Sequence, residues 1–398
     1  MGKSEKMKPY VYISGLALRD NNRGTAALGY GAISFMQEKG ILSESQKLIN
    51  VYECGVKGFV KWIVKRLIGK DKIIINIEDK EWEYRVFAYL SIEKKLVNSK
   101  WFPFKDFLLS QGYAAKISVV TAINGGDGFS DIYGKRIFLQ RLPGINFAME
   151  HHLPLVLLPQ TVGPFETKDC LNIATAILKY SSIVYVRDDC YVNELESIGA
   201  KYEKTNDLSY YMKPEPWDID IDTKNAVGVN VSGLAWENNF HTLAGKFENY
   251  PQLIEGIVKM FLEMGKTVYL ISHSYNYHKP ELFNDDLKAA RELYNSLDDK
   301  SNVVLIDRDL ISPQVKYVIS RMSFFVGTRM HANFAAIYTK VPLFGLAYSY
   351  KFKGAFENNG IFNRTADVNN IKAADVDIII KKIGEAYKED VLSIMNKE

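Results

Sequence analysis

The stretch Ser323-Phe324-Phe325-Val326-Gly327-Thr328-Arg329-Met330-His331 contains the pattern that decides the fold. Its apolar run ends at a glycine, and a helix-forming sequence to Lys340 follows, which predicts a strand, a tight turn and a helix. A second apolar strand, VPLFGLA, is expected from Val341. A strand, a helix and another fully apolar strand are the repeating unit of a parallel sheet covered on both faces.

The same alternation runs through the second half of the chain. Strands are expected at 225–232, 267–272 and 302–306, and helices at 250–266, 285–297, 312–322 and from about 372 onward. The first half repeats the theme, with strands expected at 10–14, 71–77, 117–123, 155–158 and 183–186, and helices at 24–39, 84–97, 135–150, 168–180 and 188–198.

This organisation predicts an α/β protein with two Rossmann-like, doubly wound domains facing a cleft. A segment at 212–220 with two prolines and alternating acids suits a linker, so we expect one domain over 1–212 and another over 225–398. The last helix could pack back across either domain, the N-terminal one included. Ligands of such folds bind outside the carboxyl ends of the strands.

Composition narrows the class of protein. The 398 residues include 50 basic and 47 acidic side chains, and the net charge of +3 is too small for affinity based on nucleic-acid phosphates. The 3 cysteines form no C-x-x-C pair, which fits a reducing cytoplasm. The charged start predicts no signal peptide, and no apolar run is long enough to span a bilayer.

The loop that begins at Gly327 is the strongest candidate site. Thr328 could cap the following helix, whose first N–H groups attract an anion. Arg329 offers a planar fork for a carboxylate or phosphate, and His331 could transfer a proton near neutral pH. The two converge only if the helix begins after one of them. Alternatively, Arg329 pairs with a carboxylate of its own domain and His331 fills the surface.

Other loops at expected strand ends add polar and cationic residues. The candidates that could bind substrate are Asn21, Asn124, Gly125, Gly126, Gln160, Arg187, Tyr348 and Lys351. The alternative for Arg187 is an Arg-Asp helix cap, and for Lys351 a solvated loop. The glycine-rich turn at 124–128 does not have the spacing of a dinucleotide fingerprint.

Two further features of the sequence concern metal binding and membrane contact. The histidines at 151–152, 273 and 278 lack the spacing of a metal site, so no metal is expected. Residues 57–70 are basic and apolar at helical spacing, which allows peripheral contact with an anionic membrane. An ordinary packed helix with a solvated lysine face is the alternative.

Several motifs together resemble one family. They are NRGT at 22–25, NGGDGFSDIYG from Asn124, PQTVGP from Pro159, VRDD from Val186 and GTRMHANFAAIYTKVPLFGLAYSYKFKG from Gly327. In this order they are similar to the polysaccharide pyruvyltransferases. The stretch at about 40–105 departs from the pattern.

The resemblance implies a glycosyltransferase B-like fold and a cytoplasmic enzyme, which could act at the inner face of the membrane. Pyruvate would pass from phosphoenolpyruvate to a sugar of a bacterial surface polysaccharide or exopolysaccharide, or its lipid-linked precursor, as a cyclic ketal. The N-terminal domain would be the acceptor side, Arg329 would bind phosphoenolpyruvate, Arg187 would be a second anion ligand, and His331 would face the reacting centre. No cofactor is expected.

Two alternatives stay open from the sequence. A nucleotide-sugar glycosyltransferase has the same architecture, because a fold does not fix a function. It would need a ribose site in the C-terminal domain, for which no acidic residue is convincingly placed. A noncatalytic carbohydrate-binding protein could also keep the fold.

Overall fold

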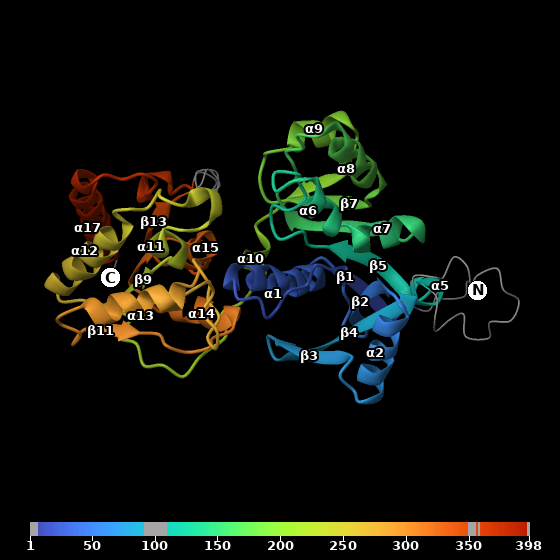
Figure 1. The fold of residues 1–398 in the computed structure, drawn as a ribbon, viewed down its shortest axis with the longest axis horizontal. Helices are drawn as coiled ribbons and strands as arrows, with labels where there is room; N and C mark the ends of the chain where they lie inside the picture. Colours follow the sequence, from blue (N-terminus) through green and yellow to red (C-terminus); the bar gives the residue numbers. More distant parts are fainter. Residues whose placement is uncertain (1–6, 91–109, 349–355, 357–358, 396–398) are drawn as a thin grey trace, which may run out of the picture. The chain divides into compact units, whose positions relative to one another are not determined.

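The computed structural model describes residues 7–90, 110–348, 356 and 359–395, and the chain divides into two compact units (Figure 1). Unit 1 comprises residues 1–17 and 28–211, and unit 2 comprises residues 18–27 and 212–398. Residues 18–27 were expected in the N-terminal domain but group with unit 2. The region expected as a linker also packs there, because Lys316 donates to the carbonyl of Met212 at 2.6 Å.

Unit 1 is built on an eight-stranded sheet with the order β3-β4-β2-β1-β5-β6-β7-β8. Its strands are β1 (Tyr10–Ser14), β2 (Lys47–Cys54), β3 (Lys72–Ile77), β4 (Lys80–Leu90), β5 (Ile117–Ala122), β6 (Leu155–Gln160), β7 (Ile183–Val186) and β8 (Tyr202–Lys204). All neighbours are parallel except β3 and β4, which form an antiparallel hairpin at the edge. The helices are α1 (Arg23–Glu38), whose first residues to Ala27 group with unit 2, α2 (Val56–Leu67), α5 (Ser110–Ala114), α6 (Lys135–Gln140), α7 (Pro143–Glu150), α8 (Lys168–Tyr180), α9 (Val192–Ser197) and α10 (Leu208–Tyr211).

Unit 2 has a six-stranded parallel sheet with the order β11-β10-β9-β12-β13-β14. Its strands are β9 (Ala226–Asn230), β10 (Thr267–Leu270), β11 (Val303–Leu305), β12 (Phe324–Gly327), β13 (Leu343–Ala347) and β14 (Thr365–Asp367). The helices are α11 (Gly233–Glu237), α12 (Tyr250–Glu263), α13 (Asp286–Ser296), α14 (Ser312–Ser320), α15 (Met330–Tyr338) and α17 (Ala373–Met395). This is the Rossmann strand order, in which the chain reverses direction between β9 and β12 and leaves a crevice at their carboxyl ends.

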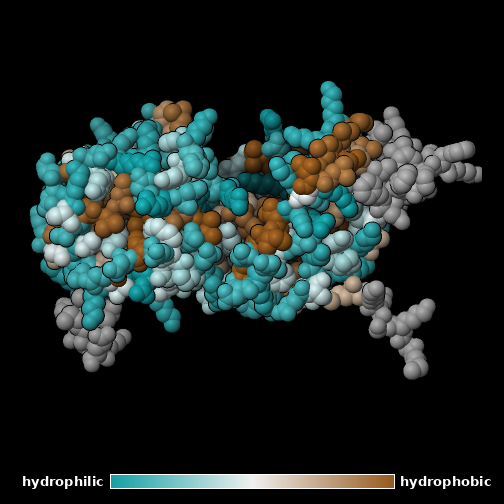
Figure 2. Space-filling model, turned by 90° about the horizontal axis from the view of Figure 1, so that it is seen from below, coloured by the Kyte–Doolittle hydropathy of each residue, from teal (hydrophilic) through white to brown (hydrophobic). Residues whose placement is uncertain are grey.

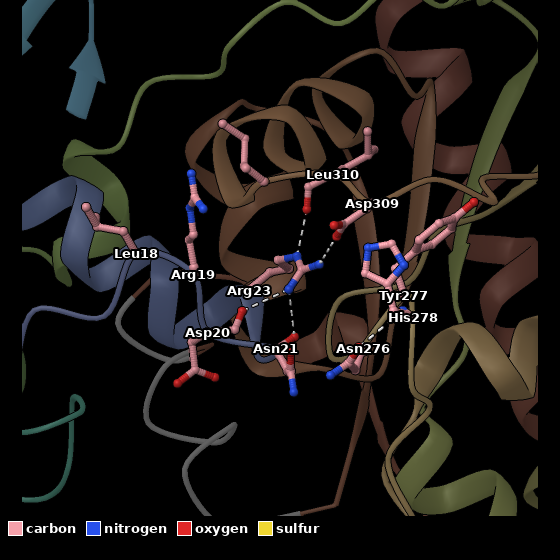
Figure 3. Close-up of a pocket in the computed structure, with 11 residues that line it drawn as sticks. Leu18, Arg19, Asp20, Asn21, Arg23, Asn276, Tyr277, His278, Asp309 and Leu310 are labelled. Carbon is pink, nitrogen blue, oxygen red and sulfur yellow. Dashed lines mark hydrogen bonds and ion pairs between the residues drawn. The ribbon is translucent and has the colours of Figure 1, made fainter. Parts of the chain in front are cut away.

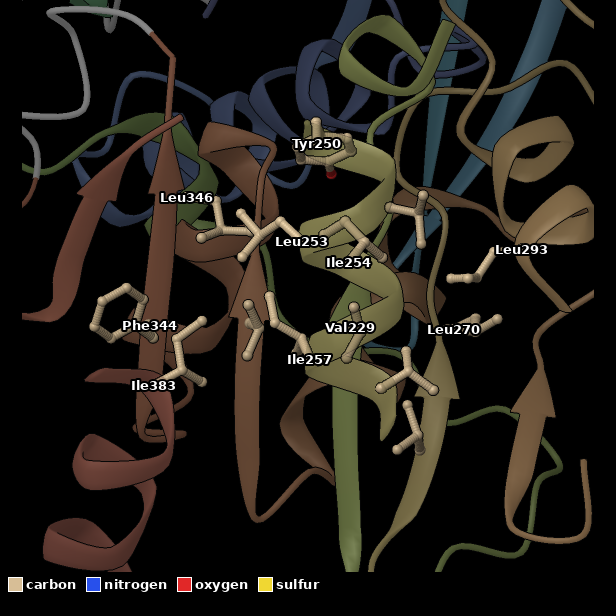
Figure 4. Close-up of a cluster of buried hydrophobic side chains, with 14 of the residues drawn as sticks. Val229, Tyr250, Leu253, Ile254, Ile257, Leu270, Leu293, Phe344, Leu346 and Ile383 are labelled. Carbon is tan, nitrogen blue, oxygen red and sulfur yellow. The ribbon is translucent and has the colours of Figure 1, made fainter. Parts of the chain in front are cut away.

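The core of unit 2 explains why α12 and α17 lie together. Apolar residues of α12 at helical spacing, among them Leu253, Ile254 and Ile257, are fully buried against the sheet (Figure 4). Tyr387 of α17 contacts Phe261 of α12 edge-on, with ring centroids 5.4 Å apart. The last helix therefore packs within unit 2, which is one of the two packings that the sequence left open.

Three local expectations for unit 1 were also wrong. Residues 84–90 belong to strand β4 and not to a helix, since Trp82 and Phe87 are buried in a sheet that pairs β4 with β2 and β3. The expected helix at 135–150 is broken into α6 and α7 at Pro143, which begins α7. Strand β2, within the stretch 40–105, was missed. Among the described residues, no helix is long and apolar enough to cross a membrane.

Candidate active site

The carboxylate of Asp286 joins the loops at the carboxyl ends of β9 and β10. It is fully buried and accepts hydrogen bonds from the backbone N–H groups of Gly233 at 2.9 Å, His273 at 3.1 Å and Ser274 at 2.9 Å. The Asn230 amide adds a longer bond of 3.3 Å. A buried carboxylate needs this many donors because it has lost its hydration. Asp286 thus fixes the loops that line the crevice of unit 2.

Arg329 completes the neutralisation of this carboxylate. Its Nη2 lies 2.6 Å and its Nε 3.0 Å from Oδ1 of Asp286, and Nη2 also donates to Asn284 Oδ1 at 2.8 Å. Burial disfavours the charged guanidinium, but Asp286 and Tyr348 outweigh burial and raise the pKa of Arg329. The structure therefore shows the alternative, an ion pair within the domain. Any ligand of Arg329 must share the guanidinium with Asp286.

The turn after β12 places the start of α15 in the crevice. Arg329, and not Thr328 as expected, is the N-cap residue, and its own N–H donates to Asn230 Oδ1 at 2.9 Å. Thr328 is fully buried, and its hydroxyl lies 2.7 Å from that of Tyr250, so it cannot reach the helix N–H groups. Because α15 begins at Met330, the condition for Arg329 and His331 to face one region is met.

Two histidines lie together at this point. Burial lowers the pKa of His273 well below its ordinary value, and the nearby charges of His331, Arg329 and Arg23 lower it further. The first turn of α1 packs closely here, because a Cβ added to Gly24 would lie 2.6 Å from Nδ1 of His331. His273 and Gly24 were not predicted as site residues. Gly24 lies in the NRGT motif and His273 was considered only as a metal ligand, and the two come together only through the fold.

A pocket of about 440 Å³ lies beside this cluster within unit 2. Arg23 fixes its wall by donating to the carbonyls of Leu310 at 2.7 Å and Asp20 at 2.8 Å, and by pairing with Asp309 at 3.0 Å (Figure 3). The lining residues that offer polar or aromatic side chains are Arg19, Asp20, Asn21, Arg23, Asn276, Tyr277, His278 and Asp309. Of the predicted residues, Asn21 lies here, and its amide donates to Glu281.

In unit 1, five predicted residues lie close together at the carboxyl ends of β5, β6 and β7. Asn124 donates to Oε1 of Gln160 at 3.1 Å, while Nε2 of Gln160 is buried without a partner among the described residues. A Cβ on Gly126 would lie 2.9 Å from Nη1 of Arg187, and the positive φ of 82° at Gly126 would strain any side chain there. Gly125 is the neighbouring residue of the same turn and has a positive φ of 72°.

The charge of Arg187 is already compensated. Its Nη1 lies 2.6 Å from Asp207, whose side chain is only 2% exposed. Arg141 differs, since it forms no ion pair with any described residue, and burial lowers its pKa. Its Nη1 donates to the carbonyl of Asn124 at 3.3 Å. Arg141 is thus a cation that the sequence reasoning missed, because it lies after a short helix and not in a motif.

The remaining predicted residues belong to the loop after β13. Tyr348 packs edge-on against Phe247 at 6.1 Å between ring centroids and interacts with Arg329. Lys351 lies outside the described residues.

The sequence was also compared with models of known protein families. A family model described as polysaccharide pyruvyl transferase matches residues 46–350, more than half of the chain. The chain belongs to the polysaccharide pyruvyl transferase family. The matched range includes most of the stretch at 40–105 that was expected to depart from the pattern. A search of curated proteins found no match.

Solved structures share the fold of this pyruvyl transferase family member. The UDP-GlcNAc 2-epimerase of Methanocaldococcus jannaschii is 12% identical with a TM-score of 0.53, over 95% of this chain and 91% of that one. A putative UDP-N-acetylglucosamine 2-epimerase of Listeria monocytogenes is 9% identical with a TM-score of 0.50, over 97% and 91%. The E. coli heptosyltransferase WaaC is 12% identical with a TM-score of 0.46, over 95% and 99%. The fold is of the glycosyltransferase B type, as expected.

Replacing Asp286 by asparagine tests the role of its charge. Asp286→Asn leaves the guanidinium of Arg329 buried without a counter-ion, and we expect it to lower the free energy of unfolding by about 3–5 kcal/mol in urea denaturation. Asp309→Asn is the matched control, because its ion pair with Arg23 has a carboxylate that is 53% exposed, and it should cost less than about 1 kcal/mol. Equal losses in the two variants would contradict this role.

The depressed pKa of His273 predicts a pH dependence of stability. Below about pH 6.5 the unfolded chain binds a proton at this histidine that the folded chain does not, so unfolding becomes easier by about 1.4 kcal/mol per pH unit until the folded pKa is reached. His273→Asn should therefore lose less stability than the parent between about pH 7 and pH 5.5. His241→Asn, at an exposed position, should behave like the parent. A parallel loss in all three proteins would refute the prediction.

Proposed function

We propose that the protein transfers the pyruvyl group of phosphoenolpyruvate to two hydroxyls of a sugar as a cyclic ketal. The acceptor would be part of a bacterial surface polysaccharide or exopolysaccharide, or its lipid-linked precursor. The observation that carries the proposal is the placement of Arg329 and His331 at the start of α15, beside the strand-order reversal, in a chain of the pyruvyl transferase family. We place the reaction in the cytoplasm.

The reaction needs an acid, a base and stabilisation of an anion. A proton is added to the methylene carbon of phosphoenolpyruvate, and one sugar hydroxyl attacks the neighbouring carbon while giving up its proton. The bond from that carbon to the phosphate oxygen then breaks, phosphate leaves, and the second hydroxyl closes the ring with loss of its proton. His331 is the group we assign to proton transfer. We propose that no metal or cofactor takes part.

Asp286 changes the expected task of Arg329. Since this carboxylate already neutralises the guanidinium, Arg329 alone cannot balance the carboxylate and phosphate of the donor. We propose that Arg329 orients the donor, and that positive charge comes also from the first N–H groups of α15, from His331 when protonated, and from Lys351. A neutral His273 beside them can accept or donate a hydrogen bond without adding charge.

The pocket next to His331 suits the acceptor. Its volume of about 440 Å³ exceeds the needs of phosphoenolpyruvate, and carboxylates, amides and an aromatic ring together are groups that bind sugar hydroxyls and sugar faces. It is linked to His331 through adjacent residues, since Arg23 lines the pocket and Gly24 contacts His331. The acceptor contacts thus include residues 18–23, which belong to unit 2 and not to the N-terminal domain first expected to be the acceptor side.

The assay that tests the proposal combines phosphoenolpyruvate with glycan acceptors and measures phosphate release and ketal formation. His331→Asn should lower kcat by about 10²–10⁴-fold while the protein stays folded. His152→Asn is the control, because His152 is exposed in unit 1 at a positive φ that asparagine tolerates. Sugar transfer from a nucleotide sugar, with no phosphate released from phosphoenolpyruvate, would establish the rival glycosyltransferase.

Kinetics of pocket variants separate acceptor from donor binding. Arg19→Ala and His278→Ala remove exposed side chains that line the pocket, and each should raise KM for the acceptor up to about tenfold, leaving KM for phosphoenolpyruvate unchanged. Arg308→Ala, an exposed position outside the pocket lining, serves as control. A rise in the donor KM with an unchanged acceptor KM would assign the pocket to the donor.

A further inference from the structure

Helix α2 of unit 1 has one buried face and one exposed apolar face. Phe59 and Trp62 are buried against the sheet, and the indole N–H of Trp62 donates to the carbonyl of Val86 at 2.7 Å. These contacts fix which face of α2 points outward. The large apolar residues on the outward face are 51–81% exposed: Val56, Val60, Val64, Leu67 and Ile68.

The spacing of these exposed residues forms a continuous stripe. Val56, Val60 and Val64 are four residues apart and Leu67 follows three later, so they lie in one row along the helix. The edge strand β3 follows directly, and its Ile73 and Ile74 are each 50% exposed. Figure 2 shows hydrophobic residues gathered on the face that includes this part of unit 1. Contiguous exposed apolar surface of this kind indicates an interaction site.

The charges that flank the stripe along helix α2 are all positive. Lys57, Lys61 and Lys65 each follow one of the exposed valines by one residue, and Lys70 lies beyond the helix end. No acidic residue occurs from 55 to 70. All four lysines are exposed, and none forms an ion pair with a described residue. A helix with one apolar row beside a row of lysines matches the surface of an anionic bilayer.

We infer that α2 docks unit 1 on an anionic membrane surface. The helix lies parallel to the bilayer, with the valine row and Leu67 in the headgroup boundary and the lysines at the lipid phosphates and carboxylates. A second copy of the chain is a poorer occupant, since self-association through α2 brings the two lysine rows together. The inference is independent of the donor and acceptor chemistry proposed above.

The magnitude of the effect can be bounded. Each lysine near an anionic surface strengthens binding by about fivefold, so three lysines contribute about a hundredfold at low salt. The apolar row adds affinity that salt does not screen. Binding should therefore be reversible, stronger on anionic than on neutral lipid, and weakened but not abolished by salt.

The experiment is co-sedimentation of the full chain with vesicles of phosphatidylcholine alone or mixed with an equal part of phosphatidylserine. We expect binding to the mixed vesicles to be at least about tenfold stronger, and weaker at high salt. The triple variant Lys57→Gln, Lys61→Gln, Lys65→Gln should lose about a hundredfold, and Val60→Glu with Val64→Glu should lose binding. Leu282→Glu with Ile378→Glu, at exposed apolar positions 75% and 54% accessible in unit 2, is the matched control and should bind like the parent.

Three results would overturn the inference. They are no binding to phosphatidylserine vesicles at low salt, binding that both α2 variants retain, and a dimer in sedimentation velocity that Val60→Glu with Val64→Glu dissociates. Because the substituted side chains are exposed, we expect each variant to fold. Circular dichroism of each variant checks that a loss of vesicle binding does not come from misfolding. Activity on a soluble acceptor should be unchanged in all of the variants, so failure here leaves the proposed function intact.

Discussion

The buried carboxylate of Asp286 is the constraint on which the candidate site depends. It has no solvent exposure, so its charge must be balanced inside the protein by Arg329 and by N–H groups from two other loops. Each of these donors is thereby held at one place. The start of α15, the side chain of His331 and the loop that carries His273 are consequently positioned by one anion that comes from a fourth part of the chain.

Close backbone approaches extend this arrangement. A Cβ on Gly233 would lie 2.3 Å from the carbonyl carbon of Asp285, so the start of α11 can approach the Asp286 loop only with glycine there. The hydroxyl of Ser312 donates to the carbonyl of Arg23 at 2.6 Å, which holds residues 18–27 against unit 2. The segment that follows the first strand of the chain is thereby part of the site in the second unit.

Local sequence patterns predicted the strands and helices of unit 2 but only some of the contacts in its candidate site. The strand, turn and helix around Gly327 were read correctly, because apolar runs and helical spacing are properties of neighbouring residues. The sequence did not show which carboxylate pairs with Arg329, since Asp286 lies 43 residues away, at the start of a polar helix. Strand β4 was mistaken for a helix because a mixed edge hairpin shows neither a fully apolar run nor strict alternation. Pairing across the sheet decided its conformation.

Each of the two units pairs its motif arginine with a buried carboxylate. Arg329 pairs with Asp286 and Arg187 with Asp207, each at 2.6 Å and each with a carboxylate that is almost completely buried. A buried, paired arginine keeps its geometry but presents little net charge, so it can orient an anion without binding it strongly. In the proposed reaction, tight binding of a donor with a phosphate and a carboxylate would then rest on helix N–H groups and on cations that lack a buried acid. In the mechanism proposed for unit 2, Arg329 would thus orient the donor while other groups attract it.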